Sequence, residues 1–297
     1  MIYSSNLCVE SFSNFNKGSF EENCIREGLM HTCNLCSTNH AEILTKEDLK
    51  HCVELEVLIL DNTISLTKEP TKSSSLHNGF YRILGIGSMG YADHLAYKKI
   101  PYSKAQDYTK NLAKEIYTIA LRKSSLLAKE RGSYMCFSKE NFIKNLPADI
   151  QADTDLIECI RKNGMRNGSL IAIAPNTSTS VLLGCSSSIL PIFSKFFIDK
   201  NSKGSVPVVA KYLNKDTFLY YQENKNMDQN NVIDIVSCFQ QYTDQGISME
   251  LYIDVNKITA VDLYNYYINA WKKGCKTVYY VRQITKQKEE SCISCAN

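Results

Sequence analysis

An amide, a thiol and a carboxylate stand at alternate positions near the start of the chain, as Asn6, Cys8 and Glu10. In an extended segment, side chains two residues apart point to the same face. That face would offer a hydrogen-bond donor, a sulfur atom and a base to one small polar ligand. Because so short a pattern also arises by chance, it indicates a candidate site and no particular reaction.

Two pairs of cysteines have the spacing Cys-x-x-Cys: Cys33 with Cys36, and Cys292 with Cys295. Together they could form a four-thiolate zinc site, but such pairs are usually separated by roughly 15–20 residues, and here most of the chain lies between them. Each pair could instead form its own disulfide. The second pair suits thiol exchange, because a flexible exposed segment gives thiolates access to another disulfide. The alternative is a dispensable tail.

Five small hydrogen-bonding residues follow a buried apolar run that ends at Pro175; they are Asn176, Thr177, Ser178, Thr179 and Ser180. Hydroxyls, an amide and free backbone N–H groups at the carboxyl end of a strand make an anion pocket, typically for phosphate. A Ser/Thr-rich surface loop explains the same pattern equally well.

Two other motifs have a structural explanation beside a chemical one. The segment Gly85–Gly90 fits the dinucleotide pattern G-x-G-x-x-G, but the acidic residue at the required distance, Asp107, begins a long helix instead of ending a second strand. We therefore expect these glycines to permit tight strand–helix packing. Tyr279 and Tyr280 lie in an apolar strand, where packing is the usual role of aromatic side chains.

The elements that must position these residues alternate in type. Apolar periodicity predicts helices over residues 105–131 and 230–242, and a Thr259/Asp262 capping box opens a third that runs to Trp271. Strands are predicted over residues 169–174, 248–254 and 276–283. Strands interleaved with helices of this length indicate an α/β fold.

Composition excludes several classes of protein. With 34 Lys and Arg against 31 Asp and Glu, the net charge of +3 is too small for a protein that binds nucleic acids or membrane surfaces through its charge. No apolar run approaches the roughly 18 residues that span a bilayer, and the first residues lack the features of a signal peptide. We therefore expect a cytoplasmic protein whose 12 Cys are reduced thiols.

Taken in order, these motifs resemble the large, catalytic (α) subunit of ribonucleotide reductases. The resemblance covers essentially the whole chain and runs through Ile2–Glu10, Cys33–Asn39, Leu84–Gly90, Gly164–Asn167, Ala174–Ser180, Gly184–Ile189, Asp244–Ser248, Lys276–Tyr280 and the Cys-x-x-Cys tail. It implies the C-terminal portion of a ten-stranded α/β barrel, with the radical cysteine on a loop inserted in the barrel. Residues 1–284 would be this barrel part and residues 285–297 a mobile tail.

The resemblance also implies a role for each residue near the start of the chain. Cys8 would become the thiyl radical that removes the 3′-hydrogen of the substrate ribose. Glu10 would take the 3′-hydroxyl proton and Asn6 would orient the ribose. Cys33 would be one of the two thiols that reduce the 2′-position and end as a disulfide. Such a set requires near-contact geometry, about 3–3.5 Å between reacting atoms.

Further roles come from the same resemblance. Residues 176–180 would bind the nucleotide phosphates. Tyr279 and Tyr280 would relay the radical from a small (β) subunit containing iron or manganese, so that this chain itself holds no cofactor or metal. Because adjacent residues of a regular strand face opposite ways, we expect a strand end or a distortion at the tyrosines. Cys292 and Cys295 would re-reduce the active-site disulfide and exchange with a thioredoxin- or glutaredoxin-like donor.

The chief departure from the family lies at the start of the sequence. Met1 stands shortly before Cys8, whereas the family carries upstream the effector site, half of the barrel and the second reducing thiol. We therefore expect the C-terminal piece of a split or truncated large subunit, which needs an N-terminal half as a partner. The substrate would be a ribonucleotide. An inactive nucleotide- or partner-binding remnant of the family and a zinc-binding thiol module are the alternatives.

Overall fold

The computed structural model describes residues 5–13, 19–21, 24–26, 28–201 and 204–284. Helices and strands interleave along this part of the chain, as predicted for an α/β protein. The strands are β1 (Ser19–Glu21), β2 (Cys24–Arg26), β3 (Leu35–Asn39), β4 (Gly85–Met89), β5 (Phe196–Asn201), β6 (Gly204–Val209), β7 (Glu250–Ile253) and β8 (Tyr280–Gln283). The α-helices are α1 (Lys46–Leu66), α2 (Lys72–Tyr81), α3 (Tyr91–Tyr97), α4 (Gln106–Arg131), α5 (Lys139–Lys144), α6 (Ala148–Gln151), α7 (Thr154–Asn163), α8 (Thr177–Leu183), α9 (Gln229–Gln240) and α10 (Ala260–Lys272).

The central strands are parallel. β3 pairs with β4, with Leu35 opposite Gly85, and β7 pairs with β8, with Glu250 opposite Tyr280. Residues 169–174 lie between these two sheets and join them through parallel bridges on either side, from Ile86 to Ile171 and from Ile173 to Ile247. The resulting order is β3, β4, residues 169–174, β7 and β8. The described residues do not close this arrangement into a barrel.

Residues 169–174 do not form the regular strand that the sequence predicts, because only isolated bridges at Ile171 and Ile173 pair them with their neighbours, but the segment is buried as expected. Leu170, Ile171, Ala172 and Ile173 are all buried. Backbone bonds run from Ile86 N–H to Leu170 O and from Ser248 N–H to Ile173 O. A nearly continuous apolar run is what a segment covered on both faces requires.

The glycines of the Gly85–Gly90 motif serve strand packing. A Cβ atom at Gly85 would lie 2.1 Å from Leu35 Cδ2, and one at Gly87 would lie 2.5 Å from Ser37 Oγ. Side chains of β3 therefore cross over bare backbone of β4. Gly90 has a positive φ of 70° and precedes α3. The prediction that these glycines pack a strand against a helix is thus wrong, because Gly85 and Gly87 lie closest to Leu35 and Ser37 of the neighbouring strand β3.

Three helices begin and end close to where the sequence predicts. α4 ends before Gly132, which has a φ of 81°. Thr259 and Asp262 form the predicted capping box at the start of α10, and Asp228 caps α9. α4 lies against α1, α7 and α9, and the buried core between these helices includes Val53, Leu121 and Val236.

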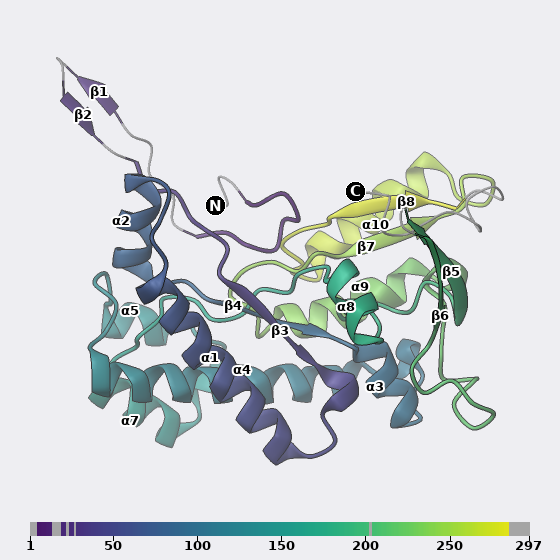
Figure 1. Ribbon diagram of the computed structural model, residues 1–297, viewed down its shortest axis with the longest axis horizontal. Helices are drawn as coiled ribbons and strands as arrows, with labels where there is room; N and C mark the ends of the chain where they lie inside the picture. The colour runs from purple at the N-terminus through teal and green to yellow at the C-terminus, as the bar shows by residue number, and fades with distance from the viewer. Residues whose placement is uncertain (1–4, 14–18, 22–23, 27, 202–203, 285–297) are drawn as a thin grey trace.

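Two antiparallel hairpins extend from this body (Figure 1). β1 and β2 form one at the end near α2, and β5 and β6 form the other at the opposite end, beside α8 and α9. None of the helices in the described ranges has the length and apolar character that a membrane crossing demands.

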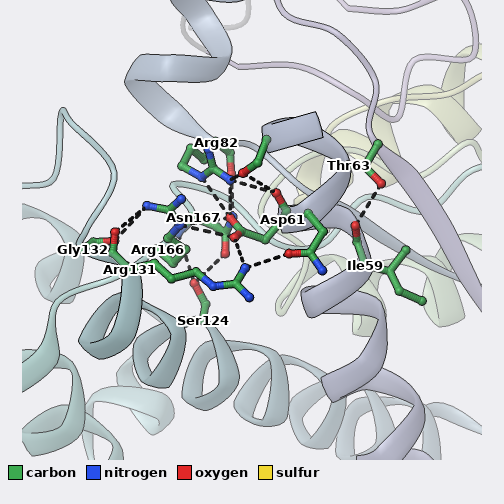
Figure 2. A network of polar contacts seen from close by, with 11 residues as sticks. Ile59, Asp61, Thr63, Arg82, Ser124, Arg131, Gly132, Arg166 and Asn167 are labelled. Atoms are coloured by element: carbon green, nitrogen blue, oxygen red, sulfur yellow. Dashed lines mark hydrogen bonds and ion pairs between the residues drawn. The ribbon is translucent and has the colours of Figure 1, made fainter. Parts of the chain in front are cut away.

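A buried carboxylate ties several helices together. The side chain of Asp61, on α1, is completely buried and makes ion pairs with Arg82, Arg131 and Arg166 at 2.7, 3.0 and 3.2 Å. Figure 2 shows the three guanidinium groups converging on it from the end of α2, the end of α4 and the segment after α7. Asn167 Nδ2 adds a hydrogen bond at 3.3 Å. Burial alone would raise the pKa of Asp61, but Arg82 and the other two arginines outweigh it and hold the pKa below its usual range.

We expect Asp61→Asn to lower the free energy of unfolding by about 3–5 kcal/mol at neutral pH, because it leaves three arginines without their shared counter-charge. Since the folded pKa is lowered, the contribution of the charge is complete above the ordinary aspartate pKa and is lost as the pH falls through the lowered value. Urea unfolding at pH 7 and pH 3 measures both effects. The exposed Asp216→Asn is the control; an equal loss in both variants would contradict the central role of Asp61.

Candidate functional site

The segment that carries Asn6, Cys8 and Glu10 is a tight turn. Val9 N–H donates to Asn6 O at 3.1 Å, Asn6 N–H donates to Ser11 O at 3.0 Å, and Val9 has a positive φ of 60°. The expectation of an extended segment is therefore wrong. The turn leaves Cys8 partly exposed, while Glu10 is only 2% exposed.

Residues at the start of β7 anchor this turn from the other end of the sequence. Ser248 Oγ donates to Cys8 O at 2.6 Å and lies 3.1 Å from Glu10 Oε2. Gly246 N–H donates to Glu10 O at 2.7 Å. A Cβ atom at Gly246 would lie 2.5 Å from Val9 O, so only glycine permits this approach of the two backbones. The turn is thus held against the sheet by backbone and hydroxyl contacts.

An unbroken line of contacts leads from Cys8 to the two tyrosines. The Cys8 thiol donates to the Tyr279 hydroxyl at 3.5 Å, and the ring centroids of Tyr279 and Tyr280 are 3.8 Å apart. β8 begins at Tyr280, which confirms the strand end predicted at this point and lets both rings stack. Burial, the Cys8 thiol and Tyr280 together raise the pKa of Tyr279, so its hydroxyl keeps its proton at neutral pH.

Tyr280 has a fixed electrostatic neighbour. The guanidinium of Arg282 lies 5.0 Å from the Tyr280 ring centroid and is held by Glu250 through bonds of 2.6 and 2.9 Å. This ion pair joins β7 to β8 beside the stacked rings. It thereby fixes the strand that presents Tyr280.

The two thiols of the first Cys-x-x-Cys pair have different surroundings. Cys33 is exposed, and its pKa is raised chiefly by desolvation, with further contributions from the nearby Glu10 and Cys8; a hydrogen bond from Ser11 opposes the rise. Cys36 instead packs against the helical core, where burial and the nearby carboxyl of Glu56 on α1 raise its pKa. The structure therefore brings Cys33, and not Cys36, to the Cys8 turn.

Glu56 is a buried carboxyl behind β3. Its Oε2 accepts from Thr38 Oγ1 at 2.8 Å, and Cys52 Sγ lies 3.9 Å from the same hydroxyl. Burial raises the pKa of Glu56 to about 7, despite the opposing hydrogen bonds of Thr38 and Cys36. This carboxyl therefore gains or loses its proton near neutral pH.

The residues predicted to bind phosphate form a turn and the first part of α8 instead of a loop. Asn176 has a φ of 56°, and its amide donates to Ser37 Oγ at 2.9 Å and Ala174 O at 3.2 Å. Ser180 is buried and donates to Thr177 O at 2.9 Å. Ser178 and Thr179 are exposed. Asn176 and Ser180 thus shape the turn, and the first N–H groups of α8 have no partner within the helix, as at every helix start.

A cavity beside α8 is lined by Thr177 and Ser180 together with Lys211 and Arg282. Its cations are already paired within the protein, Lys211 with Glu42 and Arg282 with Glu250. An anion at α8 would therefore depend on N–H and hydroxyl donors more than on a free positive charge.

Two further predictions concern the thiol-exchange tail and the four-thiolate zinc site. Cys292 and Cys295 lie outside the described residues, so the tail remains a prediction. Within the described ranges no three His, Cys, Asp or Glu side chains are grouped in a way that could hold a metal ion. Cys33 and Cys36, moreover, point to different surroundings.

Sequence reasoning did not assign a role to the residues that hold the turn. Gln245 Oε1 accepts from Phe12 N–H at 3.1 Å, and its amide donates to Leu84 O at 2.7 Å. Ser11 Oγ lies 2.6 Å from His31 Nε2. The segment Asp244–Ser248 was part of the family resemblance, and its polar residues at the entrance to a buried strand were the available signal.

We expect the free energy of unfolding to fall as the pH rises from about 4.5 to about 7, because folded Glu56 keeps a proton that the unfolded chain releases. The full effect is about 3 kcal/mol. Glu56→Gln, which stays neutral, should be more stable than the parent at pH 8 and nearly equal to it at pH 4. Urea titrations at the two pH values test this, with Glu54→Gln on the same helix as control. An unchanged pH slope in Glu56→Gln would contradict it.

Ser248→Ala should loosen the Cys8 turn without unfolding the chain. Two hydrogen bonds disappear, each with a net contribution of about 0.5–1.5 kcal/mol, so we expect Cys8 to be alkylated roughly 5–150 times faster. Peptide mass spectrometry after iodoacetamide treatment measures the rate at Cys8. Ser194→Ala, a substitution in another region, is the control, and equal Cys8 rates in parent and Ser248→Ala would reject the anchoring role.

Comparisons with known proteins identify the family. The family model described as "Ribonucleotide reductase, barrel domain" matches residues 1–281. Ribonucleoside-diphosphate reductase subunit alpha of Synechocystis sp. is 38% identical over 99% of this chain and 40% of the relative. The Helicobacter pylori subunit alpha is 31% identical over 90% of this chain and 36% of the relative. The Mycoplasma pneumoniae subunit alpha is 30% identical over 98% of this chain and 45% of the relative.

The chain thus spans less than half the length of these curated relatives, within their large-subunit sequence. The match includes the Cys8 turn, Cys33 and the β3 strand after it, and both tyrosines. With a family model covering nearly all of its length, this chain belongs to the ribonucleotide reductase large-subunit family and matches its barrel domain.

Proposed function

We propose that this chain is the C-terminal catalytic part of a ribonucleoside-diphosphate reductase large subunit, which reduces ribonucleotides to deoxyribonucleotides. The observation that carries the proposal is the line of contacts from Cys8 Sγ to the Tyr279 hydroxyl, 3.5 Å, and from the Tyr279 ring to the Tyr280 ring, 3.8 Å. A thiol that meets a stacked pair of redox-capable phenols is suited to receive an oxidising equivalent from outside the site.

The first step takes place at Cys8. Oxidation through the tyrosines removes the hydrogen atom of the Cys8 thiol and leaves a sulfur-centred radical. This radical takes the 3′-hydrogen of the substrate ribose, re-forming the thiol and leaving a carbon radical. Glu10 accepts the 3′-hydroxyl proton. Its carboxylate is supported by the hydrogen bond from Ser248 at 3.1 Å, and Asn6 orients the ribose.

The second step removes the 2′-hydroxyl as water. Cys33 and a second thiol supply two electrons and two hydrogens and become a disulfide, so the ribose loses one oxygen and the thiols lose two hydrogens. Cys8 then returns its hydrogen to the 3′-carbon. The position of Cys33, close enough to Glu10 and Cys8 to respond to their charges, supports this assignment. Cys292 and Cys295 would re-reduce the disulfide and pass it to a thioredoxin- or glutaredoxin-like donor.

Substrate phosphates would bind at the start of α8. Helix N-termini favour anions through their free N–H groups and dipole, and Thr177, Ser178 and Thr179 add hydroxyls there. Asn176, with its bonds to Ser37 and Ala174, would hold the turn in position. α8 also lies at the carboxyl end of residues 169–174, next to β3 and β4, where ligands bind in parallel α/β sheets.

Two kinds of partner follow from the proposal. The curated relatives are more than twice as long as the matched region, so activity requires the parts of the large subunit that lie outside this match, including the second reducing thiol. The oxidising equivalent comes from a small subunit with an iron or manganese centre, and this chain supplies only the protein path to Cys8.

The test is a reconstitution of this chain with the remaining large-subunit segment, the small subunit and a dithiol donor. Cys8→Ala should lower deoxynucleotide formation at least 1,000-fold, because no other group can abstract the hydrogen atom. Tyr279→Phe keeps the stacked ring but removes the hydroxyl that contacts Cys8, and should cause a similar loss. Product is measured by chromatography of labelled nucleotide.

Matched variants control for indirect damage. Cys136→Ser removes an exposed thiol and Tyr97→Phe removes a phenol hydroxyl on α3; both should retain product formation. Assembly of each variant is checked by gel filtration. Parent-level turnover in Cys8→Ala would reject the radical role, and a parent chain that assembles and binds nucleotide without turnover would identify an inactive remnant.

A further inference from the structure

The ring of Tyr280 is only half-buried, yet it lies in stacking contact with Tyr279, with 3.8 Å between the ring centroids. Tyr279 has other contacts that hold it, from the Cys8 thiol to its hydroxyl and from its own N–H to Met249 O at 2.7 Å. Ordering a half-buried side chain costs conformational entropy, which further contacts must offset. The groups around the remaining face of the Tyr280 ring therefore decide whether the stack persists.

Arg282 covers that remaining face. Its guanidinium lies 5.0 Å from the Tyr280 ring centroid. The two residues stand two positions apart on β8, so their side chains point to the same side of the strand. Tyr279 already covers one face of the ring, which leaves the other face for the guanidinium. Tyr280 is thus enclosed between an aromatic ring and a planar cation, a group that stacks well on aromatic faces.

The guanidinium is itself held in place. Arg282 donates through two nitrogens to the two carboxylate oxygens of Glu250, at 2.6 and 2.9 Å, and this paired geometry fixes the plane of the guanidinium. Glu250 stands directly opposite Tyr280 in the register of β7 and β8. The Tyr252 hydroxyl lies 3.5 Å from the Glu250 carboxylate, and Tyr252 N–H donates to Gln229 Oε1 of α9 at 2.8 Å. The cation over Tyr280 is therefore anchored to the sheet and to a helix behind it.

We propose that Arg282, held by Glu250, is a positioning residue that keeps the Tyr280 ring stacked on Tyr279. The inference rests on the proposed function, in which Tyr280 belongs to the relay. There Tyr280 gives one electron and its phenol proton towards the small subunit and takes an electron and a proton from Tyr279, while Arg282 and Glu250 exchange neither. Such transfer requires the two phenols in near contact, so a ring that leaves the stack interrupts the path to Cys8.

The experiment places 3-fluorotyrosine at position 280 of the full chain and records its fluorine NMR resonance without substrate or partner. The neighbouring ring shifts this resonance while the two rings are stacked, and Tyr279→Ala supplies the unstacked reference. Arg282→Gln removes the planar cation and should lower the ratio of stacked to unstacked ring about 2- to 30-fold, the range that a cation–π contact covers. The resonance should therefore move towards that of Tyr279→Ala.

Graded variants test whether the effect follows the geometry of the cation. Arg282→Lys keeps the charge but loses the planar fork, so its resonance should lie between those of the parent and Arg282→Gln. Glu250→Gln leaves an oxygen that still accepts from Arg282 and should cause a smaller shift in the same direction. Lys273→Gln removes a different ion pair, with Asp234 of α9, and should leave the resonance at the parent position.

Hydrogen exchange separates positioning of the ring from general support of β8. The N–H groups of Tyr279 and Ile284 flank β8 and donate to Met249 O at 2.7 Å and Ile253 O at 2.8 Å. Both should remain protected in Arg282→Gln, because they bond to backbone and not to the ion pair.

The inference is overturned if Arg282→Gln keeps the parent resonance. It is also overturned if the resonance moves only together with loss of protection at both flanking N–H groups, since that would show a detached strand. Neither measurement involves turnover. Parent-level product formation by Cys8→Ala would reject the proposed function and leave these measurements unaffected, so the two failures are distinguishable.

Discussion

The site depends on one close approach between distant parts of the chain. Cys8 and Tyr279, 271 positions apart in the sequence, meet because the turn around Val9 is clamped to residues 246–248. Gly246 allows the two backbones to touch, and Ser248 bonds to both Cys8 and Glu10. In the reaction proposed above, a misplacement of a few tenths of an ångström would slow hydrogen transfer steeply, so this clamp would set the distance between Cys8 and Tyr279. The two ends meet beside the sheet, because residues 246–248 lead directly into β7.

The regular elements could be predicted because their signals are local. A capping box at Thr259 and a glycine at position 132 act within one helical turn, and both place helix ends correctly. The Cys8 turn could not be derived in this way. Alternating polar residues indicate an extended segment, but Val9 adopts a left-handed φ in a turn whose neighbours Cys8 and Glu10 are bonded to the distant residues Gly246 and Ser248. The direction of Cys33 and Cys36 also depends on which face of β3 meets α1, and spacing alone does not reveal that.

Two buried carboxyls on α1 show how surroundings decide protonation. Asp61 faces three arginines and stays charged, whereas Glu56 faces a hydroxyl and thiols and holds its proton up to about pH 7. Both lie on the same helix, and each ties it to other parts of the chain: Asp61 to the ends of two helices, Glu56 to β3. Charge pairing joins helix to helix, and neutral hydrogen bonds join helix to sheet, where a lone charge would be costly.

The bare backbone of Gly85 and Gly87 has a consequence for the shape of the sheet. Both glycines lie on the face of β4 turned away from α1, where Leu35 and Ser37 reach across them. A strand emptied of side chains on one side can bend toward that side, as glycine kinks do in curved sheets. The motif that mimics a nucleotide fingerprint thus leaves β4 free to curve around the side chains of β3. Any larger residue there would press against Leu35 Cδ2 or Ser37 Oγ and force β3 and β4 apart.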